Sequence, residues 1–151
     1  MADANGQCGA WAEFFIDTLR SQGIGGADKI GVYAASNPGN DGFLVKSWSF
    51  IGSGSSPGTS PYSWVVGTDV VDNAGVPGQG NPNPPGAFFN HFIVRFGGRY
   101  YDPSYGGPSY ATQWEWEDAS LDGFFTIIGG VALAKPNDLG PANVETLFVV
   151  I

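Results

Sequence analysis

The chain has one cysteine and one histidine, and each stands in a context that suits catalysis. Cys8 lies in the run Gln7-Cys8-Gly9-Ala10-Trp11, and His91 lies far downstream in the run Phe89-Asn90-His91-Phe92-Ile93-Val94. Asp102 follows His91 closely, beyond a glycine pair. A thiol nucleophile, an imidazole that takes up its proton and a carboxylate that orients the imidazole make up a catalytic triad. The types and order of these residues therefore predict a triad of Cys8, His91 and Asp102.

The cysteine stands at the start of the one clear amphipathic helix in the sequence. Across residues 8–22, Trp11, Phe15 and Leu19 recur at helical spacing, and a glycine follows as a typical stop signal. Cys8 would then lie in the first turn, where free backbone N–H groups and the helix dipole favour a thiolate. The backbone N–H of Cys8 is also a candidate donor to the oxyanion of an acyl-transfer reaction.

The histidine and the aspartate are predicted on the two strands of one hairpin. The run Phe96-Gly97-Gly98-Arg99 favours a two-residue turn, because glycine adopts positive φ without strain. With Phe96 opposite Arg99, Ile93 lies opposite Asp102, and His91 becomes a diagonal neighbour of Asp102 on the same face. The Asp102 carboxylate can then accept a hydrogen bond from the imidazole, whereas a slip of one residue would separate the two side chains.

The rest of the chain alternates short apolar segments with turns. We predict strands at residues 30–34, 43–51, 63–71, 88–96, 124–128, 131–134 and 145–151, and surface loops at residues 52–60 and 75–86. One helix followed by many strands is typical of an α+β fold with a mainly antiparallel sheet. The length of 151 residues fits a single domain that spans residues 1–151.

The charge balance excludes several classes of partner. Six Lys and Arg against 14 Asp and Glu leave a net charge of −8, which argues against binding to nucleic acid or to an anionic membrane surface. No apolar run is long enough to span a bilayer, and no signal peptide is recognisable. Because Met1 stands so close to Cys8, we expect a domain excised from a longer protein that has additional domains. The low Lys content and the abundant Gly, Asn, Ser and Tyr favour an exported bacterial protein.

Two clusters of acidic residues, at positions 69–73 and 114–118, are considered as a metal site and as part of a substrate cleft. Asp69, Asp72 and Asn73 do not have the spacing of a dedicated calcium loop, and one cysteine with one histidine cannot fill a tetrahedral metal shell, so we expect no metal and no cofactor. The segment 114–118 alternates tryptophan with acidic residues. This alternation predicts a strand with one solvated face, or alternatively a cleft wall that attracts an amine donor.

Two blocks of the sequence resemble a known family. Positions 6–24, which contain Gly6-Gln7-Cys8-Gly9-Ala10-Trp11-Ala12, are similar to the nucleophile helix of the transglutaminase-like superfamily. Positions 91–104, with His91-Phe92-Ile93-Val94 and Tyr100-Tyr101-Asp102-Pro103, resemble its histidine strand and its aspartate strand. The resemblance implies a papain-like fold, in which the nucleophile helix packs on an antiparallel sheet. It also implies that Cys8 is the nucleophile, His91 the general base and acid, and Asp102 the orienting carboxylate.

The chain departs from the related papain-type proteases near the nucleophile. Those proteases have a second cysteine just before the tryptophan as nucleophile, where this chain has Ala10. Their oxyanion glutamine stands several residues before the nucleophile, whereas Gln7 directly precedes Cys8. We assign substrate binding to Gln7, Trp11 and Tyr101.

The predicted activity is thiol acyl transfer on a protein or peptide amide. Cys8 would form a thioester, and water or an amine would resolve it, which gives a cysteine peptidase or amidase in one case and a transglutaminase in the other. The sequence leaves this choice open, and we favour a hydrolase. The alternative is a non-catalytic structural or binding domain that retains the fold, with Cys8 as a buried apolar residue and His91 as a structural histidine.

Overall fold

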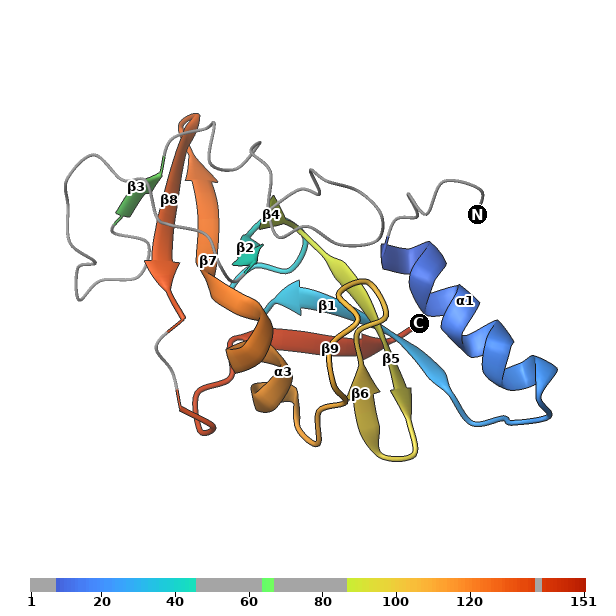
Figure 1. Cartoon of the computed structure of the whole chain (residues 1–151). Helices are drawn as coiled ribbons and strands as arrows, with labels where there is room; N and C mark the ends of the chain where they lie inside the picture. Colours follow the sequence, from blue (N-terminus) through green and yellow to red (C-terminus); the bar gives the residue numbers. More distant parts are fainter. Residues whose placement is uncertain (1–7, 46–63, 67–86, 138–139) are drawn as a thin grey trace.

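The computed structural model describes residues 8–45, 64–66, 87–137 and 140–151. These residues form two helices and nine strands in two antiparallel sheets (Figure 1). The first sheet has the strand order β6-β5-β1-β9 and the second has the order β3-β8-β7-β2-β4. The elements are α1 (Cys8–Ser21), β1 (Asp28–Ala34), β2 (Gly42–Val45), β3 (Trp64–Val66), β4 (Ala87–Phe88), β5 (His91–Phe96), β6 (Arg99–Tyr101), α3 (Gln113–Ser120), β7 (Leu121–Ile128), β8 (Val131–Pro136) and β9 (Thr146–Val150).

The α+β class is confirmed, but the prediction of one helix and one sheet is wrong. A second helix, α3, follows the β5–β6 hairpin, and the strands divide between two sheets because different partners pair with β1 and with β2. The predicted loops at 52–60 and 75–86, Gln7 and the acidic group at 69–73 lie outside the described residues.

Helix α1 forms where the sequence predicted it, and its apolar face packs on the first sheet. Ala12 and Ile16 are buried with Val94 of β5, and Phe15 packs at the edge of this cluster. The helix ends at Ser21 because Gly23 takes a left-handed conformation with φ of 76°, and its N–H binds the carbonyl of Arg20 over 2.9 Å. Packing on β5 therefore fixes the direction in which the start of α1 points.

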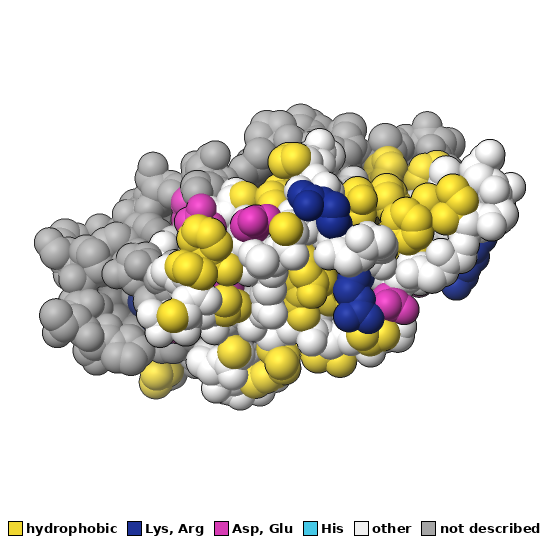
Figure 2. Space-filling model, turned by 90° about the horizontal axis from the view of Figure 1, so that it is seen from below, with side chains coloured by type: hydrophobic (Ala, Val, Ile, Leu, Met, Phe, Trp, Pro, Cys, Tyr) yellow, Lys and Arg dark blue, Asp and Glu magenta, His cyan; other side chains and the backbone are white. Residues whose placement is uncertain are grey.

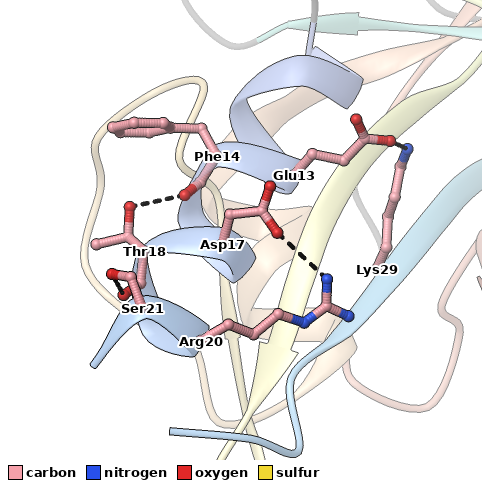
Figure 3. Close-up of polar contacts among 7 residues, drawn as sticks. All are labelled: Glu13, Phe14, Asp17, Thr18, Arg20, Ser21 and Lys29. Atoms are coloured by element: carbon pink, nitrogen blue, oxygen red, sulfur yellow. Dashed lines mark hydrogen bonds and ion pairs between the residues drawn. The ribbon is translucent and has the colours of Figure 1, made fainter. Parts of the chain in front are cut away.

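The outer face of α1 is mostly polar, although Phe14 is exposed on it, and an ion pair joins it to the sheet (Figure 3). Glu13 forms an ion pair of 2.6 Å with Lys29 at the start of β1, and Lys29 also lies 4.9 Å from the ring centroid of Phe92. Asp17 and Arg20 pair within the helix over 3.2 Å, and both are well exposed. The Glu13–Lys29 contact joins α1 to β1, while the Asp17–Arg20 pair is a solvated contact of small energetic value.

The β5–β6 hairpin has the predicted register. Phe96 pairs with Arg99, and Val94 pairs with Tyr101, across a two-residue turn in which Gly97 and Gly98 have φ of 58° and 75°. Both turn residues need positive φ, which is why a glycine pair forms this turn. Strand β6 ends at Tyr101, so Asp102 is the first residue beyond it.

The predicted strand at 88–96 is two strands that belong to different sheets. Phe88 of β4 pairs with Phe43 of β2, whereas His91 begins β5 and pairs with Val32 of β1. Phe89 and Asn90 form the break between them. The expectation of His91 in the middle of a strand is therefore wrong: it lies at the end of the first sheet, where a neighbouring element can reach its ring.

The segment 114–118 is helical, so the predicted strand is wrong, and the role of its acidic residues as a cleft wall stays a prediction. Thr112 caps α3 by accepting a hydrogen bond of 3.1 Å from the N–H of Glu115. Glu117 is fully buried rather than solvated, and its carboxyl group accepts hydrogen bonds from the N–H and the hydroxyl of Thr146 at 2.9 and 2.7 Å. This residue anchors α3 to the start of β9.

The first sheet is covered on both faces. One face carries Ile30, Val32 and Ile93, which pack with Trp116 of α3 and Phe124 of β7, and the other face packs against α1. Seen from below, the basic side chains are separated from one another by hydrophobic and uncharged ones (Figure 2). In the described part of the chain, no helix is long and apolar enough to cross a membrane.

Candidate active site

His91 and Asp102 form a buried pair at the end of the first sheet. His91 Nε2 lies 2.9 Å from Asp102 Oδ2, and each side chain is only 1% exposed. The hairpin register accounts for this contact, since it puts both residues on one face of the sheet. The contact also distinguishes the two ring nitrogens: Nε2 forms the hydrogen bond with the carboxyl group, and Nδ1 is left for another partner.

The Asp102 carboxylate is held by three donors. Oδ2 accepts from His91 Nε2 and, over 3.0 Å, from Trp116 Nε1, while Oδ1 accepts from the backbone N–H of Ser104 over 3.2 Å. Hydrogen bonds from N–H groups stabilise the charged form of a carboxyl group that burial would otherwise disfavour. The three donors hold the Asp102 carboxyl group in a fixed orientation toward the imidazole.

Cys8 completes the group from the first turn of α1. Its thiol is half-buried, and burial raises its pKa more than any other single effect alters it. The interactions with His91 and the backbone N–H groups of Phe92 and Gly9 act in the opposite direction, and together they lower the net pKa of the thiol. His91 Nδ1 is buried, and no atom of the described residues lies at ordinary hydrogen-bond distance and angle from it. It is therefore the ring nitrogen that remains available to the thiol. The arrangement favours a thiolate.

The same interactions act on the imidazole in the opposite direction. Burial lowers the pKa of His91, but the charge of Asp102, its hydrogen bond and the interaction with Cys8 raise it to about 10. The raised pKa of His91 and the lowered pKa of the Cys8 thiol both favour an imidazolium–thiolate pair. This is the ion pair that a cysteine nucleophile needs.

Aromatic rings enclose the imidazole. Trp116 stacks on it with ring centroids 6.0 Å apart, Tyr105 lies at 5.3 Å, and Phe88 lies at 5.8 Å. Burial and the negative charges of Asp102 and Cys8 raise the pKa of Tyr105, which keeps its hydroxyl protonated. These rings exclude water, which strengthens each charge interaction in the site.

Sequence reasoning missed Trp116 and Tyr105 as members of this site. The sequence does predict the helix that carries Trp116, because Thr112 followed by Glu115 has the spacing of a capping box, which marks the start of a helix. Tyr105 is one of four tyrosines near Asp102 in the sequence, with Tyr100, Tyr101 and Tyr110; most of them are expected to be packing residues and one or two to line the cleft. It lies in a loop whose base is closed by two hydrogen bonds of 2.8 Å between the backbones of Tyr100 and Tyr110.

The predicted substrate-binding residues are distributed differently. Trp11 is half-buried on α1, and its ring meets Phe14 edge to face at 6.2 Å. Tyr101 packs against Phe15 of α1 with ring centroids 5.4 Å apart, in the cluster on the opposite face of the sheet from Trp116. Gln7 lies outside the described residues. A substrate role for these three residues stays a prediction.

The described residues offer no second centre of comparable chemistry. Within them, no group of three or more His, Cys, Asp or Glu side chains could hold a metal ion. A groove of about 320 Å³ lies between α1, the start of β1 and Ile151, but it contains none of the triad residues. Its charged side chains include the Glu13–Lys29 and Asp17–Arg20 pairs, so they already satisfy one another.

Comparison of the chain with protein-family models, with curated proteins and with solved structures gives no match.

Proposed function

We propose that this protein is a thiol acyl-transfer enzyme that acts on protein or peptide amides. The observation that carries the proposal is the buried pair of His91 and Asp102, 2.9 Å apart, beside a half-buried thiol whose pKa is lowered. A structural histidine does not need a cysteine at a helix start next to it, and a core cysteine would have a raised thiol pKa. The combination is what nucleophilic catalysis by cysteine requires.

The reaction would begin with attack of the Cys8 thiolate on an amide carbonyl carbon. A carbon–sulfur bond forms, and the carbonyl electrons move to oxygen, where the backbone N–H of Cys8 is a candidate donor to the oxyanion. As the tetrahedral intermediate collapses, the carbon–nitrogen bond breaks, and the His91 imidazolium gives its proton to the leaving amine. The products are a free amine and a thioester on Cys8.

The second half of the reaction regenerates the thiolate. Neutral His91 removes a proton from water or from an amine as that molecule attacks the thioester, and the carbon–sulfur bond breaks. Asp102 holds the imidazole in place and stabilises the imidazolium in both halves. Water yields a carboxylic acid and an amine yields a new amide.

We place this activity in a transglutaminase-like, papain-like framework, with no cofactor, and we favour hydrolysis over crosslinking. In support, α1 packs on an antiparallel sheet that carries His91 at one strand end and Asp102 directly after the next strand. The acidic chain agrees with a protein or peptide substrate rather than nucleic acid.

The test uses an activated acyl donor, so that it does not depend on knowing the natural substrate. The protein is mixed with p-nitrophenyl acetate, and release of p-nitrophenol is followed together with the intact mass. We expect an acetyl group on Cys8 and turnover that Cys8→Ala abolishes, and glutamine peptides with and without an amine then separate hydrolysis from transfer. Absence of an acyl-enzyme in folded protein would sink the proposal in favour of a non-catalytic domain.

A further inference from the structure

Trp116 contacts both members of the buried His91–Asp102 pair, although the reaction scheme above gives it no step. Its indole N–H donates to Asp102 Oδ2 over 3.0 Å, the same oxygen that lies 2.9 Å from His91 Nε2. Its ring is nearly parallel to the imidazole, with an interplanar angle of 17°. We propose that Trp116 is a positioning residue, whose indole N–H holds the Asp102 carboxylate in the orientation that keeps Oδ2 directed at His91. This inference rests on the acyl-transfer function proposed above.

The need for such a residue follows from the freedom of the aspartate side chain. The terminal torsion of an aspartate has a broad energy minimum, so a carboxylate rotates unless its oxygens are held by donors. At Asp102 the backbone N–H of Ser104 holds Oδ1 with a longer bond of 3.2 Å, and among the described residues the donors to Oδ2 are His91 and Trp116. With the side chain 1% exposed, water is poorly placed to replace a lost donor.

Trp116 can act as a fixed donor because its own position is determined by packing. It is fully buried, and its ring meets Phe43 and Phe148 edge to face at 6.4 and 5.6 Å. The next residue, Glu117, binds Thr146 and so holds α3 against β9 (Figure 1). The helix and its buried ring thus place the N–H without help from the triad.

Hydrophobic packing alone would explain the burial of the ring but not the direction of its N–H. A phenylalanine could fill much of the same space, but it lacks the indole N–H. That N–H donates to Asp102 Oδ2, the same oxygen that contacts His91 Nε2. The test therefore compares Trp116→Phe with wild type. Trp114→Phe is the matched control, since it changes an indole on the same helix two positions away.

The measurement is the rate of Cys8 alkylation by iodoacetamide between pH 5 and 9. The titratable groups around Asp102 are His91 of β5, Cys8 of α1, and Tyr105 and Tyr110 of the following loop. Loss of a hydrogen bond to a buried charge should weaken the Asp102–His91 contact and, through it, the thiolate. We expect Trp116→Phe to be alkylated about tenfold more slowly below neutral pH, with the thiol pKa raised by about one unit.

A double-mutant cycle separates positioning from a merely structural effect. If Trp116 acts through Asp102, the effect of Trp116→Phe should largely vanish in an Asp102→Ala background, whereas a structural effect should be additive. Equal effects in both backgrounds, or an unchanged thiol pKa in Trp116→Phe, would overturn the proposal and leave the triad intact. An ordinary thiol pKa in wild type would instead remove the proposed function itself.

A second readout on wild-type protein covers the case in which Trp116→Phe does not fold. In an NMR spectrum, the indole N–H with contacts to the His91 ring should shift with the same pH midpoint as Cys8 alkylation. An indole signal that does not change across that midpoint would count against the proposal.

Discussion

The reactivity of Cys8 at low pH should depend on His91, and His91→Ala is the most direct perturbation of the site. Burial raises the pKa of the Cys8 thiol above its ordinary 9.0, and the hydrogen bond and charge of His91 are the largest effects that lower it. In His91→Ala these effects disappear, and only the backbone N–H groups of Phe92 and Gly9 still favour the thiolate. We therefore expect the thiol pKa to return to about 9 or above.

The size of the effect follows from the contact that is lost. A hydrogen bond to a charged group contributes about 1.5–3 kcal/mol, which corresponds to a change of about ten- to hundredfold in the thiolate fraction. A thiol with a pKa of 9.0 is only about 1% ionised at pH 7. Alkylation of His91→Ala at pH 7 should thus be at least about tenfold slower than that of wild type.

The assay is the rate of iodoacetamide alkylation, followed by intact mass from pH 5 to 9. Wild type should stay reactive as the pH falls below 8, because its thiol pKa is lowered, while the rate for His91→Ala should fall about tenfold per pH unit. Ile93→Val is the control, since Ile93 is buried two residues along the same strand and does not titrate. The same profile for wild type and His91→Ala would refute the ion pair.

Two further predictions concern the framework of the site. Gly42→Ala should lower the free energy of unfolding by about 1–3 kcal/mol, because a Cβ at Gly42 would lie 2.5 Å from ring atoms of Phe125. Urea denaturation measures this change. Gly25→Ala is the control: it has open space around it and should change the free energy of unfolding by less than about 0.5 kcal/mol. Glu117→Gln should lower the thermal midpoint, at a cost of about 1–3 kcal/mol, because in either orientation the amide N–H₂ replaces a carboxylate oxygen that accepts from the backbone N–H of Glu145 or Thr146. Calorimetry that shows an unchanged midpoint would contradict this role.

Helix α1 and the β5–β6 hairpin could be predicted because local rules determine both. The apolar spacing of Ala12 and Ile16 defines one buried helix face, and Gly97 with Gly98 favours a two-residue hairpin turn. The register of the hairpin then followed by counting, and it placed Asp102 within reach of His91.

The errors arose where the sequence of a segment is compatible with two structures. The segment 88–96 is rich in apolar residues on both sides of Asn90 and His91, so its composition does not show that β4 and β5 belong to different sheets. In the segment 114–118, alternation of acidic and aromatic residues imitates a strand, while the capping contact between Thr112 and Glu115 makes a helix. In the segment 88–96 the structure depends on which strands pair with it, and in the segment 114–118 it depends on the N-cap at Thr112.

The sequence by itself determined the candidate triad, the helix that starts at Cys8 and the hairpin that joins His91 to Asp102, because residue type, periodicity and turn chemistry are local properties. Only the tertiary structure decided that the start of α1 reaches the open end of β5, and that the indole of Trp116 ends on the Asp102 carboxylate. These contacts join segments far apart in the chain. They depend on which faces are buried together, and the same burial gives the charges of the site their strength.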